Sequence, residues 1–132
     1  MLKAESKKEL ETFDVLKWVL ASYKTQKNDK ISASLPELHD AIYQLTKEHP
    51  DLWQDYIFEQ RPHFHYCREL EIDLSNLEMA GHLSTPNPEL REYGLEEKLI
   101  KSFDTYGRPN FSEDELSNFQ RMADKLGSLL EN

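Results

Sequence analysis

Three residues with metal-binding side chains, His63, His65 and Cys67, stand at alternate positions in this chain of 132 residues. On a β-strand, alternate side chains project to the same face, and imidazole and thiolate groups are good zinc ligands. A structural zinc site normally needs four ligands, however, and the sequence has no second cysteine. Cys67 also stands at the start of a predicted helix, which would break the alternation. We therefore interpret the three as packing residues, and we predict no metal and no cofactor.

A second segment with oxygen donors is Asp104–Glu115. Its length, its first and last residues and the helices predicted on both sides resemble an EF-hand. A calcium loop needs oxygen ligands at its third and fifth positions and glycine at its sixth. Those positions hold Tyr106, Arg108 and Pro109, so we expect no calcium. A related pattern runs from Lys24 to Leu38, and the resemblance leaves one alternative fold open, an all-α, degenerate EF-hand-like helix-loop-helix pair.

The sequence offers little for catalysis. It contains no G-x-S-x-G motif, no phosphate-binding glycine loop and no H-E-x-x-H helix. The three acids Glu69, Glu71 and Asp73 alternate along a predicted helix, so they do not converge on one point. Because no nucleophile can be paired with a base, we name no catalytic residue and predict that the chain is not an enzyme.

The elements that would position a site are clearest between Arg68 and Leu95. Leucines 70, 74 and 77 recur at intervals of four and three, which predicts a helix with one apolar stripe. Gly81 is typical of a helix C-terminus, because glycine tolerates a left-handed backbone. The segment from His82 to Tyr93 has turn-forming residues in its middle, Thr85-Pro86-Asn87-Pro88, and it predicts a β-hairpin.

A helix followed directly by a hairpin resembles the third helix and wing of a winged helix-turn-helix domain. The resemblance implies a mostly helical α+β fold with a small β-hairpin, the wing, and additional C-terminal helices. We expect a single domain over residues 1–132, with a winged-helix-like core at about residues 7–95 and a C-terminal helical extension at about residues 96–132.

Capping motifs and apolar spacing predict the other elements. The pattern S-x-x-E, which stabilises helix starts, begins at Ser6, Ser34 and Ser112. We expect the first helix to end near Gln26 and the second before Pro50. A short strand over residues 31–33 would lie between them. The predicted central core consists of Leu16, Leu20, Leu38, Ile42, Leu70, Leu74 and Leu77.

The last predicted helix has an apolar face formed by Phe119, Met122, Leu126 and Leu129. An amphipathic helix must cover such a face, either with the core of its own domain or with the same helix of a second subunit. These four residues are therefore our candidate contacts for a homodimer.

The net charge of −9 argues against nucleic acid as a partner. Residues 1–30 hold seven lysines and five acids, a net charge of +2, so residues 31–132 carry −11. We favour a non-enzymatic module that binds protein through the acidic face of the helix over residues 67–80, through the last helix, or through both. The alternative is a DNA-binding transcriptional regulator that uses Lys7, Lys8, Lys17, Arg68, Asn76 and Arg91.

The candidate contacts for a protein partner or for DNA are Arg68, Glu71, Ser75, Asn76, Asn87 and Arg91. We expect no contact with a membrane, because no segment approaches the ~20 apolar residues of a membrane span and the first residues lack the pattern of a signal peptide. A lone cysteine cannot form an intramolecular disulfide, which agrees with a reducing compartment. Together these features predict a cytoplasmic protein.

Overall fold

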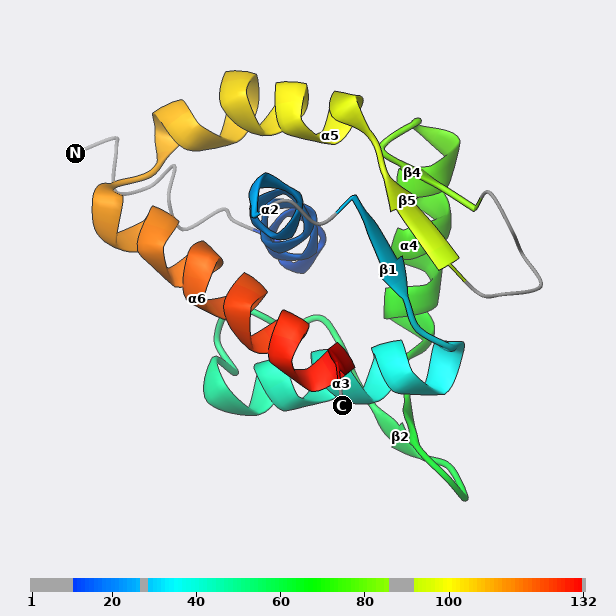
Figure 1. Ribbon diagram of the computed structural model, residues 1–132. Coiled ribbons are helices and arrows are strands. Elements are labelled where there is room, and N and C mark those ends of the chain that lie inside the picture. Colours follow the sequence, from blue (N-terminus) through cyan, green and yellow to red (C-terminus); the bar gives the residue numbers. More distant parts are fainter. Residues whose placement is uncertain (1–10, 27–28, 86–91, 132) are drawn as a thin grey trace.

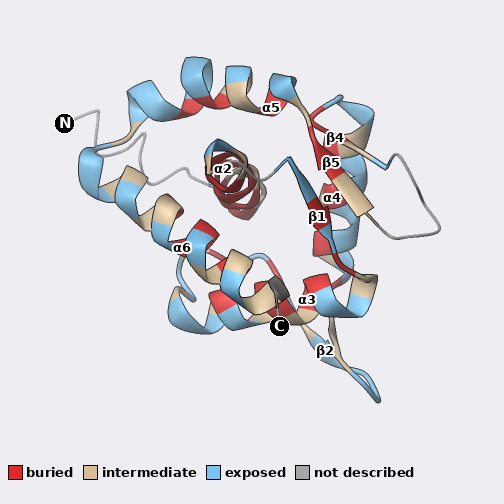
Figure 2. Ribbon diagram, in the orientation of Figure 1, coloured by how far each residue is buried: buried red, intermediate tan, exposed pale blue. Residues whose placement is uncertain are grey.

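The computed structural model describes residues 11–26, 29–85 and 92–131. Figure 1 shows helix α2 (Thr12–Thr25) at its centre, seen nearly end-on and surrounded by the other elements. Helix α5 (Glu97–Ser102) lies above α2 in this view, α6 (Glu113–Glu131) to its left, α3 (Leu35–Glu48) below it, and the β-sheet and α4 (Arg68–Met79) to its right. Because apolar and small residues occur on every side of α2, most of this helix is buried (Figure 2).

Helix α2 ends at Thr25, one residue before the predicted end. At its start, Glu11 occupies the N-cap position without a side-chain cap. The capping motif predicted at Ser6 lies outside the described residues. The hydroxyl Oγ1 of Thr12 accepts a hydrogen bond of 3.0 Å from the main-chain amide of Asp55, which ties the start of α2 to the segment that follows α3.

Helix α3 begins with the predicted capping box. The Ser34 amide donates to Glu37 Oε1 at 2.8 Å, and the Glu37 amide donates to Ser34 Oγ at 3.3 Å. The helix ends at Glu48, two residues before Pro50. Its predicted apolar residues Leu38, Ile42 and Leu45 are buried. The predictions for both ends of α3 are confirmed.

Helix α4 buries Leu70, Leu74 and Leu77 as predicted. It ends at Met79, and Gly81, two residues later, has a φ of +85°, which lies in the left-handed region. The amide of His82 donates to the Leu77 carbonyl at 2.9 Å, and the amide of Gly81 donates to the Glu78 carbonyl at 3.0 Å. This pair of hydrogen bonds is the Schellman motif, which satisfies the last carbonyls of a helix and redirects the chain.

The predicted hairpin is present as strands β4 (Leu83–Ser84) and β5 (Glu92–Leu95), which pair antiparallel with Leu83 opposite Leu95. The predicted short strand is β1 (Lys30–Ser32), which pairs with the other edge of β5 and places Ile31 opposite Tyr93. The sheet order is therefore β1-β5-β4. An all-α chain has no such sheet, so the EF-hand-like alternative fold is wrong.

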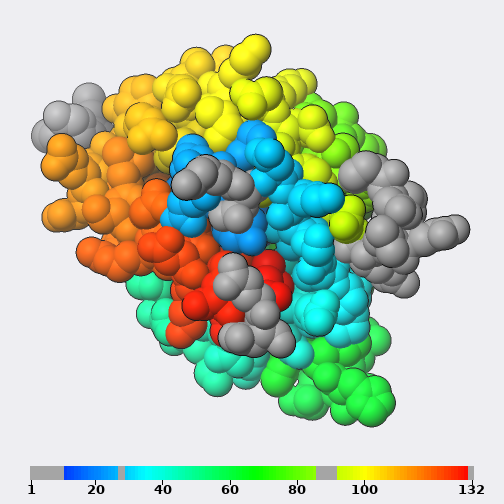
Figure 3. All heavy atoms as spheres, viewed as in Figure 1, coloured from blue at the N-terminus to red at the C-terminus, as the bar shows by residue number. Residues whose placement is uncertain are grey.

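A second, two-stranded ribbon joins α3 to α4 and was not predicted. Strands β2 (Glu59–Gln60) and β3 (His65–Tyr66) pair antiparallel, and the ribbon protrudes from the body at the lower right of Figure 3. Its aromatic side chains pack on α3. The Tyr66 ring stacks on His39 with the centroids 5.2 Å apart, and the His65 ring stacks on Tyr43 at 3.9 Å.

After β5, the chain returns over α2 as α5, a π-helical turn (Phe103–Gly107) and a short 3-10 helix (Arg108–Asn110). These helical turns occupy the segment that resembled a calcium loop, which does not form. Helix α6 then begins with the predicted capping box, in which the Ser112 amide donates to Glu115 Oε1 at 2.8 Å. The Glu115 amide returns a hydrogen bond of 3.2 Å to Ser112 Oγ.

Helix α6 packs against α2 and α3. Phe119, Met122 and Leu126 are at most 3% exposed and belong to the same core cluster as the seven predicted core residues, each of which is at most 5% exposed. The prediction that these three residues contact a second subunit is therefore wrong, because their own chain already covers them. Leu129 is only partly buried. None of the described helices has the length and apolar content that a membrane span requires.

Candidate functional site

The outward face of α4 carries an unusual set of exposed residues. Arg68, Ile72, Ser75 and Met79 follow one another at intervals of four, three and four, so they form a single stripe opposite the buried leucines. Met79 is 80% exposed and Ile72 is 47% exposed. A third large apolar side chain, Ile57, is 70% exposed and lies at the start of the helix, where its amide approaches Glu69 Oε1 at 3.5 Å. We call Ile57 and these four residues the α4 stripe.

Acidic side chains flank the α4 stripe on both sides. Glu71 and Glu78 lie along one side, and Glu69 and Asp73 lie along the other. Several are held in place by neighbours, since the Tyr56 hydroxyl donates to Asp73 Oδ2 at 2.7 Å and the Tyr66 hydroxyl donates to Glu71 Oε1. Burial raises the pKa of the Asp73 carboxyl, and the charges of Glu69 and Asp55 add to this effect.

The start of α4 is fixed by a buried histidine of α3. His39 is fully buried, and its Nδ1 accepts a hydrogen bond of 3.0 Å from the Cys67 amide. Cys67 is the N-cap of α4, and its Sγ accepts from the Leu70 amide at 3.4 Å. Burial raises the pKa of the Cys67 thiol to about 12, so this group is neutral at ordinary pH. The Cys67 side chain therefore caps a helix and is poorly suited to act as a nucleophile.

The three candidate zinc ligands of the sequence, His63, His65 and Cys67, make separate contacts. His63 is exposed at the tip of the ribbon, while His65 Nδ1 lies 3.2 Å from Asp40 Oδ1 and the thiol of Cys67 caps α4. Across residues 11–26, 29–85 and 92–131, no three side chains of the metal-binding types gather into one group.

Acidification should destabilise the fold through His39. Burial lowers the pKa of His39 below its ordinary value of 6.5, although the nearby charges of Glu71 and Asp40 oppose this. The folded state then binds fewer protons than the unfolded state, so this contribution is complete above pH 6.5 and is lost as the pH falls. The loss is at most about 1.4 kcal/mol per pH unit for one group.

This pH effect can be isolated with the variant His39→Gln, which carries no titrating ring. Urea unfolding at about pH 7.5 and at about pH 5.5 should show that the native chain loses more free energy of unfolding than the variant does. The other acids and histidines titrate in both proteins, so their contributions cancel in the comparison. Equal losses in the two proteins would contradict the assignment to His39.

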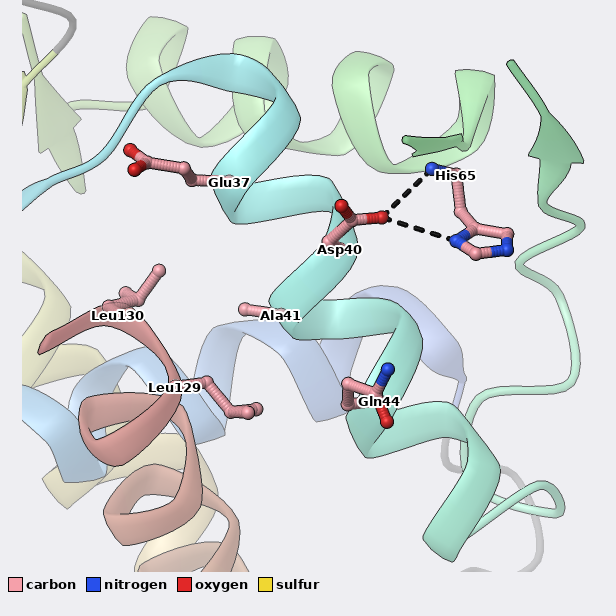
Figure 4. Close-up of a pocket in the computed structure, with 7 residues that line it drawn as sticks. All are labelled: Glu37, Asp40, Ala41, Gln44, His65, Leu129 and Leu130. Atoms are coloured by element: carbon pink, nitrogen blue, oxygen red, sulfur yellow. Dashed lines mark hydrogen bonds and ion pairs between the residues drawn. The ribbon is translucent and has the colours of Figure 1, made fainter. Parts of the chain in front are cut away.

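A pocket of about 430 Å³ lies between α3, β3 and the end of α6 (Figure 4). Asp40 Oδ1 accepts hydrogen bonds from the main-chain nitrogen of His65 at 2.8 Å and from its Nδ1 at 3.2 Å. Glu37 and Gln44 lie along the same side of α3, and Leu129 and Leu130 face them from α6. The lining therefore combines two carboxylates, an imidazole and an amide with apolar groups.

The structure places four of the six predicted contact residues together. Arg68, Glu71, Ser75 and Asn76 are all exposed on α4. Asn87 and Arg91 lie outside the described residues. The sequence analysis did not name Ile72 and Met79. Their spacing gave a signal, because a helix places both on the face opposite Leu70, Leu74 and Leu77.

Comparison of the chain with known protein families, with curated protein sequences and with solved structures found no match.

Proposed function

We propose that this chain is a non-enzymatic interaction module of winged-helix type that binds a basic protein segment through the α4 stripe. The order of its elements supports the fold assignment: α2, β1, α3 and α4 are followed by the antiparallel pair β4 and β5. In such an arrangement α4 corresponds to the third helix, and the pair of strands corresponds to the wing.

One observation carries the proposal. In the described part of the chain, four large apolar side chains are exposed. Two of them, Ile72 and Met79, lie on the outward face of α4, and a third, Ile57, lies near the start of that helix. Single exposed apolar residues are normal on a protein surface, but apolar residues gathered on one face mark sites of interaction. The seven steps from Ile72 to Met79 span about 10 Å of helix, which suits two anchor residues of a partner.

The charge around the α4 stripe defines the partner. Four carboxylates flank the stripe, and Arg68 is the one basic side chain of α4. A segment rich in lysine or arginine, with apolar residues between them, would place its apolar groups against Ile72 and Met79 and its charges against the acids. The acidic flanks would increase the association rate and exclude acidic competitors.

A defined peptide can test this proposal. The probe is an amphipathic helix of about 18 residues with leucines on one face and lysines on both flanks. We expect its binding to shift the amide resonances of Ile72, Ser75 and Met79. The double variant Ile72→Ser/Met79→Ser should weaken binding by at least about tenfold, since buried anchors dominate the energy of an interface.

The matched control for this test is Tyr106→Ser. Tyr106 is the fourth exposed large apolar side chain and is 69% exposed, but it lies on the π-helical turn away from α4. The control should bind the peptide as the native chain does. Equal weakening by the control, or peptide-induced shifts that fall on another face, would overturn the proposal.

The winged-helix order of elements is also compatible with the alternative function, a DNA-binding regulator. Among its proposed contacts, Arg68 and Asn76 are exposed on α4, Lys17 lies on α2, and Lys7, Lys8 and Arg91 lie outside the described residues. The four acids of α4 would face phosphates and weaken such binding. A labelled duplex should therefore remain free at about 50 mM salt, whereas binding with a steep loss at about 200 mM would favour the regulator.

A further inference from the structure

A second pocket, of about 400 Å³, has the opposite charge to the rest of the molecule. It lies where α2, the turn after α4, α5 and the π-helical turn meet, and its lining includes Lys17, His82, Lys98 and Lys101. Ser102, Thr105 and Tyr106 complete the lining. Three lysines thus line one cavity in a chain of net charge −9.

These lysines differ from three other lysines of the described chain. Lys24, Lys30 and Lys125 each form an ion pair, with Asp29 at 3.1 Å, Glu92 at 3.7 Å and Glu48 at 2.6 Å, respectively. Within the described ranges, Lys17, Lys98 and Lys101 have no carboxylate within 4.0 Å. No described carboxylate therefore neutralises their charges by direct contact.

The fold brings two of these lysines close to each other despite their like charge. Lys17 is half-buried, and its Nζ lies 4.9 Å from the ring centroid of Trp18. Burial lowers the pKa of Lys17, and the charge of Lys98 lowers it further, while Asp14 acts in the opposite direction. The Lys98 side chain passes over Gly81, where a Cβ atom would lie 3.6 Å from its Nζ. An anion between the lysines would remove this repulsion.

His82 provides a second observation at this pocket. The residue is 8% exposed, and its Nδ1 is buried without a hydrogen-bond partner. Buried polar atoms in native proteins nearly always have a partner. Three described residues have an unpaired one, His39, Trp53 and His82, and of these His82 lines this pocket.

We propose that this pocket binds a small organic phosphate of nucleotide size, with its phosphate held by Lys17, Lys98 and Lys101 and with a flat ring resting on Tyr106. Lysine binds phosphate as a point charge, and the hydroxyls of Ser102 and Thr105 can donate hydrogen bonds to phosphate oxygens. The cavity volume falls in the range of small-molecule sites and leaves room beyond a bare phosphate. Tyr106 lines the pocket and is 69% exposed, so its ring is accessible to a ligand.

The binding would also involve His82. Burial lowers the pKa of His82, and the charges of Lys17 and Lys98 lower it further. A bound phosphate would offset these two positive charges and could pair with the protonated ring. By thermodynamic reciprocity, a ligand that favours the protonated ring must raise its pKa.

The probe for the test is adenosine 5′-monophosphate, compared with inorganic phosphate and with adenosine, by titration calorimetry. We expect the monophosphate to bind at least about tenfold more tightly than either of its parts, because both the phosphate and the ring contribute. No binding at millimolar concentration would overturn the proposal. Equal affinity for the monophosphate and inorganic phosphate would contradict the role given to Tyr106. It would also contradict the proposal that the ligand is of nucleotide size.

Two double variants of equal charge separate a built site from general electrostatic attraction. Lys98→Gln/Lys101→Gln should weaken binding of the monophosphate at least about tenfold, and Lys30→Gln/Lys47→Gln, at exposed positions outside the pocket, should leave it unchanged. All four lysines are exposed, so neither double variant removes a core contact. Similar losses in both would overturn the site.

In a proton titration followed by NMR, the pKa of His82 should rise when the monophosphate is present. An unchanged pKa would contradict the place of His82 in the site.

Discussion

Phe119→Asp should leave the chain without a cooperative unfolding transition. Phe119 is 3% exposed, and its ring packs against that of Phe111 with the centroids 5.1 Å apart. Loss of a buried aromatic ring costs about 3–5 kcal/mol, and an unpaired carboxylate at the same site adds several more. The total approaches the whole stability of a typical domain, about 5–15 kcal/mol. Circular dichroism during heating and during denaturant titration would measure the loss.

The control for this experiment is Phe119→Leu, which keeps an apolar side chain and should keep a cooperative transition at lower temperature. Size-exclusion chromatography of the native chain completes the comparison. If the native chain is a dimer and Phe119→Asp is a folded monomer, then α6 forms a subunit interface and the packing described above does not hold in solution.

Leu74→Ala should lower the free energy of unfolding by about 2–5 kcal/mol, whereas Ile72→Ala on the same helix should change it by less than about 0.5 kcal/mol. Leu74 is 5% exposed and belongs to the core, so its truncation leaves a cavity. Ile72 is 47% exposed and points away from the core. The two substitutions change helix propensity in similar small ways, so their difference reports burial.

Urea unfolding of both variants would measure this difference. Similar costs for the two substitutions would contradict the orientation of α4, and with it the α4 stripe. If the orientation holds, Ile72→Ala should weaken binding of the basic peptide while leaving the fold intact. Leu74→Ala should have the reverse effect at temperatures where its fold persists.

Signals contained within a few residues predicted much of the fold. The capping boxes at Ser34 and Ser112 and the glycine turn at Gly81 all involve groups no more than five positions apart, so their chemistry can be read along the chain. The stripe of Leu70, Leu74 and Leu77 likewise needs only the period of one helix.

Contacts between distant residues were harder to predict. The ribbon of β2 and β3 has two residues in each strand, which is too short for an alternating pattern, and its aromatic side chains stack on His39 and Tyr43 of another helix. The apolar face of α6 was predicted, but its pattern does not distinguish the core of one chain from the surface of a second.

The candidate sites show the same difference between residues that are close in the sequence and residues that are far apart. The polar contacts on α4 were predicted because they share one helix with Arg68. The three pocket lysines come from α2 and α5, and His82 comes from the turn after α4, so no spacing in the sequence connects them. The overall acidity of the chain also pointed away from an anion site, because an average over the surface hides a local group of opposite charge.

The pairing of α2 with α6 has a consequence for synthesis. Ribosomes produce α2 near the beginning of this sequence and α6 near its end, and each helix buries its apolar face on the other. A nascent chain that stops before residue 113 would leave α2 without the cover that α6 provides. Native folding must therefore wait until residues 113–131 have left the exit tunnel, even though the local helices can form earlier.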